Sequence, residues 1–170
     1  MKKTYLAPLA IAALLLCCIC TRAEAQDNDS VGLGVSFGVA LPQHKTDEVE
    51  FEDWDASFGW GFYVNIPVVW TFHITPSAEL YQFKELNATD VNLAFKFIIP
   101  AWVLDIYVGL APGVTTVADD HLFNVGGIVG VSFNLFSNLD LFVDTKYKIL
   151  IEGDSNIRVL HAAAGVLWHF

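Results

Sequence analysis

The 170-residue chain is 54% hydrophobic and strongly acidic, with 19 Asp and Glu residues against 9 Lys and Arg residues. Because proteins bind nucleic acid mainly by placing Lys and Arg on its phosphates, this charge balance argues against a nucleic-acid partner. All three cysteines lie within the first twenty residues. The remainder of the chain can therefore form neither a disulfide nor a thiolate metal site.

The N-terminal segment has the three parts of a secretory signal peptide. Lys2 and Lys3 give a positive start, an apolar run follows over residues 6–20, and residues 23–25 read Ala-Glu-Ala. The apolar run is shorter than the ~20 residues that a membrane-spanning helix needs, and none of the cysteines follows a small residue as a lipidation site would require. We expect cleavage after residue 25, which leaves residues 26–170 as a single, still more acidic domain.

After residue 30 the sequence alternates between apolar residues and small or polar residues. In the first such segment Val31, Leu33 and Val35 point to one face, and Gly32 and Gly34 to the other. This period of two predicts strands rather than helices. Eight strands are predicted, over residues 31–41, 56–66, 70–84, 90–99, 103–114, 122–134, 139–151 and 157–170.

The predicted connections differ in length and polarity. Polar connections follow the odd-numbered strands, over residues 42–55, 85–89, 115–121 and 152–156. Tight turns follow the even-numbered strands, near residues 67, 100–101 and 135–138. An even number of strands with loops on one side and turns on the other indicates an all-β fold: an eight-stranded antiparallel up-and-down transmembrane β-barrel.

Alternation alone leaves open a soluble lipocalin-like barrel, whose apolar face points inward. Three features favour an apolar face that points outward to lipid. The opposite face is rich in Gly, Ala and Ser, which suit a narrow lumen. Aromatic residues gather near the strand ends, as in interfacial girdles. The charges of the lumen face have both signs, as buried charges require: Glu79, Asp105, Asp140 and Asp144 with Lys96, Lys146 and Lys148.

Three segments resemble the small outer-membrane barrels of the OmpA/OmpX type, and the overall pattern does so over residues 31–170. They are YVGLAPGV at 107–114, SNLDLFVDTKY at 137–147 and VLWHF at 166–170. The resemblance implies a location in the outer membrane of a Gram-negative cell, in contact with its lipid and lipopolysaccharide. It also implies that Val166, Trp168 and Phe170 form the signal read by the barrel-assembly machinery.

A charge cluster is predicted inside the barrel. If the loop after the third strand is centred between residues 87 and 88, Glu79 lies opposite Lys96, because antiparallel partners are equally far from the turn. A tight turn at residues 100–101 places Lys96 opposite Asp105 by the same rule. This cluster of Glu79, Lys96 and Asp105 would fill and lock the lumen.

An acidic surface loop follows the first strand. Its carboxylates are Asp47, Glu48, Glu50, Glu52, Asp53 and Asp55. Such a loop can bind cations or a basic partner, because calcium takes several carboxylate oxygens. However, the fixed ligand spacing of a calcium loop is lacking, and a simply solvated acidic loop is the favoured interpretation.

The histidines and hydroxyl groups give weak signals for a site. His73 and His169 lie near the same end of the barrel and both face inward, but their strands are not neighbours, so we favour isolated lumen histidines over a metal site. The only crude catalytic candidates are Ser155 with Asp154, and His121 with Asp119 and Asp120. We therefore expect no cofactor, no metal and no enzymatic activity.

The sequence thus favours a non-enzymatic outer-membrane barrel with a structural or surface-binding role. A narrow ion-conducting, porin-like barrel, a lipid A-modifying enzyme and a soluble lipocalin-like binding barrel remain alternatives, since one fold supports many functions.

Overall fold

The computed structural model describes residues 30–43, 56–69, 71–82, 87–101, 104–117, 120–136, 138–152 and 155–170. The predicted signal peptide and the acidic surface loop lie outside these residues. Within the described part of the chain, no helix is long and apolar enough to cross a membrane.

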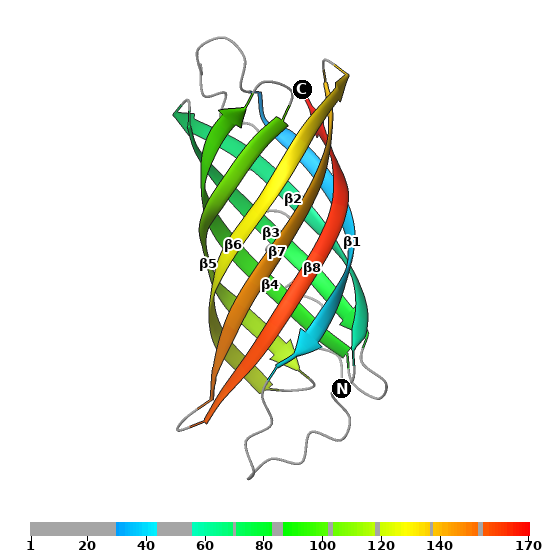
Figure 1. Cartoon of the computed structure of the whole chain (residues 1–170). Helices are drawn as coiled ribbons and strands as arrows, with labels where there is room; N and C mark the ends of the chain where they lie inside the picture. The colour runs from blue at the N-terminus through cyan, green and yellow to red at the C-terminus, as the bar shows by residue number, and fades with distance from the viewer. Residues whose placement is uncertain are drawn as a thin grey trace, which may run out of the picture.

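Eight antiparallel strands form a closed barrel in chain order, as Figure 1 shows. Each strand pairs with its sequence neighbours, and β1 pairs with β8 to close the sheet. The predicted all-β, up-and-down barrel is confirmed. The strands are β1 (Gly32–Pro42), β2 (Ser57–Val69), β3 (Phe72–Gln82), β4 (Asn87–Ala101), β5 (Leu104–Val117), β6 (Asp120–Phe136), β7 (Leu139–Glu152) and β8 (Ser155–His169).

The two ends of the barrel differ. At the end that we call the terminal end, β1 begins and β8 finishes, and Phe170 N donates to Val31 O at 3.1 Å; this end is at the top of Figure 1. At the opposite, loop end, the chain leaves β1 at Pro42 and re-enters the sheet at Ser57. Closure of β8 on β1 leaves no open sheet edge, which is the condition for a β-structure to span lipid.

Six of the eight strands are longer than the sequence pattern predicts, whereas β3 is shorter. Thr115, predicted in a loop, pairs with Leu122, and the ladder continues to Val117 opposite Asp120. Residues 100–101, predicted as a turn, belong to β4, where Pro100 pairs with Asp105. The polar residues that suggested loops lie instead in long strands, and among the loop-end connections only the first is long.

The apolar face points outward, as predicted. Large apolar side chains cover the outer wall, with Phe58 79% and Val129 54% exposed. The buried inner face instead holds Lys, Glu, Asp, Asn, Ser and Thr side chains. This is the reverse of a soluble barrel, and an apolar surface of this extent is expected only where lipid or a partner covers it.

Candidate functional site in the barrel lumen

Four charged side chains meet in the loop-end half of the lumen, and we call them the cross-lumen cluster: Glu79 of β3, Asp90 of β4, and Lys146 and Lys148 of β7. Glu79 pairs with Lys146 through Oε1 and with Lys148 through Oε2 at 3.3 Å, and Lys148 also pairs with Asp90. Both lysines are only 1% exposed. Because β7 is not a neighbour of β3 or β4, these pairs connect different parts of the barrel wall across the lumen.

Neutral donors complete the cross-lumen cluster. The Tyr63 hydroxyl donates to Glu79 at 2.8 Å, and the Tyr81 hydroxyl donates to its other oxygen. Asp90 accepts from Thr115 and, at 3.2 Å, from the Asn124 amide. Every carboxylate oxygen of the two acids therefore has a partner. This matters because removing a partner from a buried charge is far more costly than removing an exposed pair.

An apolar layer lies between the cross-lumen cluster and the loop end. It consists of inward-facing residues from seven strands, and we call it the apolar cap: Ala40, Tyr81, Ala88, Val117, Leu122, Leu150, Ile157 and Val159. All eight are buried. The loop-end half of the lumen therefore holds two layers of side chains. The apolar cap lies nearer the loop end, and the paired charges lie deeper in the barrel.

A third layer lies on the other side of the cluster. The Tyr107 hydroxyl donates to Asp144 Oδ2 at 3.1 Å, and the Lys96 ammonium lies 4.5 Å from the centre of the Tyr107 ring. Such a cation–π contact is favourable for a desolvated cation. Lys96 is 8% exposed. Among the described residues no carboxylate lies within the 4.0 Å ion-pair distance of its ammonium.

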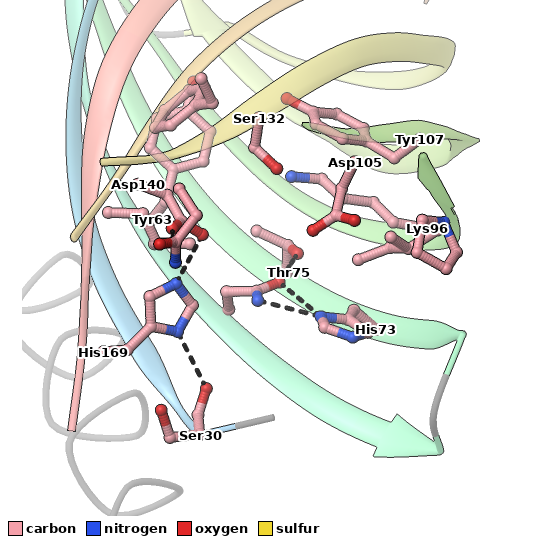
Figure 2. A pocket seen from close by; sticks show the side chains of 16 residues that line it. Ser30, Tyr63, His73, Thr75, Lys96, Asp105, Tyr107, Ser132, Asp140 and His169 are labelled. Atoms are coloured by element: carbon pink, nitrogen blue, oxygen red, sulfur yellow. Dashed lines mark hydrogen bonds and ion pairs between the residues drawn. The ribbon is translucent and has the colours of Figure 1, made fainter. Parts of the chain in front are cut away.

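Beyond Lys96 the lumen is hollow, and Figure 2 shows the residues around this space, which we call the vestibule. It has a volume of about 240 Å³. Tyr63, Lys96 and Tyr107 line its inner part, and Asp105, Ser132, Asn134, Asp140 and His169 line the part toward the terminal end. Asn65 bonds both His73, with Nδ2 to Nδ1 at 2.9 Å, and the Thr75 hydroxyl at 3.0 Å, which fixes the β2–β3 wall of the vestibule.

At the mouth of the vestibule, His169 of β8 contacts both β7 and Ser30, which precedes β1. Its Nε2 lies 2.8 Å from Asp140 Oδ2, and its Nδ1 lies 3.2 Å from the carbonyl oxygen of Ser30. Asp140 also accepts from the Asn134 amide at 3.0 Å. Both members of the His169–Asp140 pair are partly solvent-accessible, in contrast to the cross-lumen cluster.

The predicted pairing of Glu79, Lys96 and Asp105 is wrong. Glu79 lies opposite Asp90, Lys96 lies between His73 and Gly109, and Asp105 lies opposite Pro100. All three face the lumen as predicted, but β4 begins at Asn87 and continues to Ala101, so both turns were placed at the wrong residues. The shifts are even in number, so each side chain kept its face while its partners changed.

The other candidate residues have separate outcomes. Val166, Trp168 and Phe170 lie on the exposed outer face at the terminal end, and their role in assembly stays a prediction. The six carboxylates of the acidic surface loop lie outside the described residues. His73 and His169 line one vestibule, yet among the described residues no group of three or more His, Cys, Asp or Glu is placed to hold a metal.

The catalytic candidates form no described constellation. His121 Nδ1 lies 2.9 Å from the Thr116 hydroxyl on the exposed loop-end rim. The side chains of Asp119, Asp154 and Ser155 lie outside the described part of the chain.

The sequence analysis did not identify Asp90 as a lumen residue. It also did not predict that Lys146 and Lys148 pair with Glu79 and Asp90. Parity placed both lysines in the lumen. Their carboxylate partners, however, lie three or four strands away in barrel order, and this contact depends on barrel closure and stagger rather than on hairpin spacing.

Solved structures resemble this barrel, whereas sequence comparisons find nothing. No family model and no curated protein matches the chain. The crystal structure of Neisserial surface protein A superposes with a TM-score of 0.69 at 12% identity, covering 84% of this chain and 98% of that one.

Two further crystal structures show the same similarity. The outer membrane protein OprG from Pseudomonas aeruginosa gives a TM-score of 0.60 at 11% identity, covering 88% of this chain and 99% of its own. The attachment invasion locus protein Ail of Yersinia pestis gives 0.50 at 15% identity, covering 84% and 100%. At such identities the likeness concerns the fold, and this chain has the fold of the small transmembrane barrels of bacterial outer membranes.

Proposed function

We propose that the protein is an integral outer-membrane barrel whose lumen is closed, and that it serves the envelope as a structural and surface-binding element rather than as a pore or an enzyme. This proposal rests on the cross-lumen cluster and on the apolar cap, which lies between the cluster and the loop end. An ion that crossed the barrel would have to separate Glu79 from Lys146 and Lys148, which are all fully buried, and then pass an apolar layer.

The outer wall supports the membrane location. Its exposed Phe, Leu, Val and Ile side chains need a lipid environment. In this arrangement the terminal end faces the periplasm and the loop end faces the cell exterior, since long loops of such barrels are extracellular and short turns periplasmic.

Contacts with partners follow from the same placement. The outer wall contacts outer-membrane lipid and lipopolysaccharide, and the outward-facing Val166, Trp168 and Phe170 are available to the barrel-assembly machinery. We place the acidic residues between positions 47 and 55 on the cell surface, where they attract cations or a basic partner. The low content of Lys and Arg leaves no basis for a nucleic-acid partner.

Two measurements test this function. Cell fractionation with a heat-modifiability gel should find the chain in the outer membrane as a band that migrates faster before boiling. Planar bilayers loaded with the refolded barrel should show no discrete conductance steps, while a porin control in the same bilayers does. Recovery in the soluble fraction contradicts the location, and stable single-channel steps from the purified wild type contradict the closed lumen.

A further inference from the structure

The vestibule is a cavity that the closed-lumen function does not use. It reaches the terminal end past Asn134 and Asp140, and it ends inside the barrel at Lys96 (Figure 2). Its volume of about 240 Å³ is below the ~300–1,000 Å³ of pockets for drug-sized ligands. Any molecule that occupies it must therefore be small, and it must enter from the terminal end.

The wall of the vestibule is partly polar and partly apolar. On the β2–β3 side, Asn65 bonds both His73 and Thr75. At the mouth, Asp140 is paired with His169 at 2.8 Å. Because these polar groups already bond one another, the rest of the wall suits an uncharged molecule with an apolar body. That part of the wall includes apolar and aromatic side chains, among them Tyr63, Ile98, Tyr107, Phe142 and Leu167.

The inner end of the vestibule carries a primary amine. Lys96 of β4 is 8% exposed, and its Nζ lies 4.5 Å from the centre of the Tyr107 ring. No carboxylate of the described residues lies within the 4.0 Å ion-pair distance of this Nζ, whereas Lys146 and Lys148 both pair with carboxylates. Of these three buried amines, only that of Lys96 borders the vestibule.

This placement suits the Lys96 amine for nucleophilic attack. A buried cation is costly when no carboxylate pairs with it, and the neutral amine, which is the nucleophile, avoids this cost. Lysines that form Schiff bases with carbonyl compounds in enzymes are activated by the same desolvation. The carboxylates paired with Lys146 and Lys148 instead stabilise the charged ammonium, which cannot attack a carbonyl group.

We propose that Lys96 is a covalent modification site, which forms an imine with small uncharged aldehydes that enter the vestibule from the terminal end. The Nζ lone pair attacks the aldehyde carbon and forms a C–N bond, and the carbonyl oxygen takes up a proton that Nζ loses. The resulting carbinolamine loses its hydroxyl group and the remaining nitrogen proton as water, which leaves a C=N bond. One amine and one aldehyde thus give one imine and one water, without an oxidant or a reductant.

The direct test is reductive trapping on the refolded full barrel in detergent micelles. The barrel is incubated with butanal or benzaldehyde and with cyanoborohydride, which reduces an imine to a stable amine, and mass spectrometry of the digest quantifies each modified lysine. We expect Lys96 to react at least tenfold faster in the folded barrel than in the same chain unfolded in urea. A rate at Lys96 no higher than in the unfolded chain overturns the proposal.

Two internal controls accompany this measurement. In the folded barrel, Lys146 and Lys148 should stay unmodified, and an aldehyde attached to dextran, which is too large for the vestibule, should leave Lys96 unmodified. Modification of the two paired lysines at the rate of Lys96, or modification of Lys96 by the dextran aldehyde, contradicts a reaction inside the vestibule.

Variants separate the amine from the cavity. Lys96→Arg keeps a positive charge but removes the nucleophile, so the fast phase of labelling of the intact barrel should disappear. Ser132→Trp adds a large side chain to the vestibule wall and should slow the modification of Lys96 at least tenfold. Val131→Trp adds the same side chain to the opposite, outer face of β6 and should leave the rate unchanged. Equal rates in the two Trp variants contradict entry through the vestibule.

The heat-modifiability gel confirms folding of each variant before labelling. Because trapping in micelles requires neither an outer-membrane location nor an absence of conductance, its failure overturns the modification site and leaves the proposed function standing.

Discussion

The two halves of the lumen are built on the same eight strands and the same alternation, yet they treat charge in opposite ways. In the loop-end half Glu79, Asp90, Lys146 and Lys148 satisfy one another, and the apolar cap covers them. In the terminal-end half the charges of Lys96, Asp105 and Asp140 surround a space of about 240 Å³.

This difference shows how one fold combines a tightly paired layer of charges with an accessible cavity. Ion pairs that cross the lumen fix the relative positions of strands that share no backbone hydrogen bonds, and a fully satisfied polar network makes that arrangement unique. The pair of His169 and Asp140 at the mouth of the vestibule is partly accessible to solvent, so it contributes less to stability. Perturbing each half should therefore give effects of different size and kind.

The largest effect is expected from Glu79→Gln. Glu79 is the shared partner of Lys146 and Lys148, and its loss leaves buried positive charge without compensation. We expect a loss of ~3–5 kcal/mol in the free energy of unfolding, measured by urea titration of the barrel in liposomes.

A double variant checks that charge imbalance is the cause. Glu79→Gln with Lys146→Met removes one of the stranded charges, so it should be more stable than Glu79→Gln alone. Asp105→Asn in the vestibule is the control and should cost less than 1 kcal/mol because Asp105 is only partly buried. Equal losses at Glu79 and Asp105 would erase the distinction between the two halves.

The next effect concerns the outer wall that both halves share. Phe95→Arg and Val129→Arg place a charge on the lipid face, and each should cost ~2–4 kcal/mol if the residue lies near the bilayer midplane. Phe123→Arg, nearer the loop end of β6, should cost ~0–1 kcal/mol. Folding free energies in liposomes measure all three, and a harmless Arg at both central sites contradicts a membrane-embedded wall.

The sequence was sufficient for the architecture because alternation is a local signal. The number of strands and the inward facing of the predicted lumen charges follow from period two. Lys146 and Lys148, for example, were placed in the lumen by parity alone, and the structure buries both.

The partners inside the lumen could not be predicted in the same way. Hairpin arithmetic depends on the exact turn residues, and Pro100, which suggested a turn, lies within β4 opposite Asp105. Contacts across the lumen depend further on the stagger of a closed barrel. The Lys146–Glu79 and Lys148–Asp90 pairs, and the vestibule itself, therefore required the three-dimensional structure.

A smaller effect is expected where the inner face is tightly packed. A Cβ atom at Gly130 would lie 2.5 Å from the Tyr107 ring and 2.7 Å from the Asp144 side chain, whereas one at Gly127 would meet nothing within 4 Å. Gly130→Ala should cost ~1–3 kcal/mol through overpacking and displace the Tyr107 ring that holds Lys96. Gly127→Ala, on the outer face of the same strand, is the control, and thermal unfolding of both variants in micelles should separate them by this amount.

The smallest effect is expected at the mouth of the vestibule. The His169–Asp140 pair is 2.8 Å long but partly accessible to solvent, so its double-mutant coupling energy, from His169→Ala and Asp140→Ala, should be ~1 kcal/mol or less. The same cycle on Glu79 and Lys146 should give a larger coupling.

Salt provides the internal control for this last comparison. At 1 M salt the Debye length is ~3 Å, so the coupling between His169 and Asp140 should decrease on going from low to high salt. The coupling between Glu79 and Lys146 should stay nearly constant, because mobile ions cannot enter a lumen filled by side chains. If both couplings fall together, ions reach the cross-lumen cluster, and the loop-end half of the barrel is not closed.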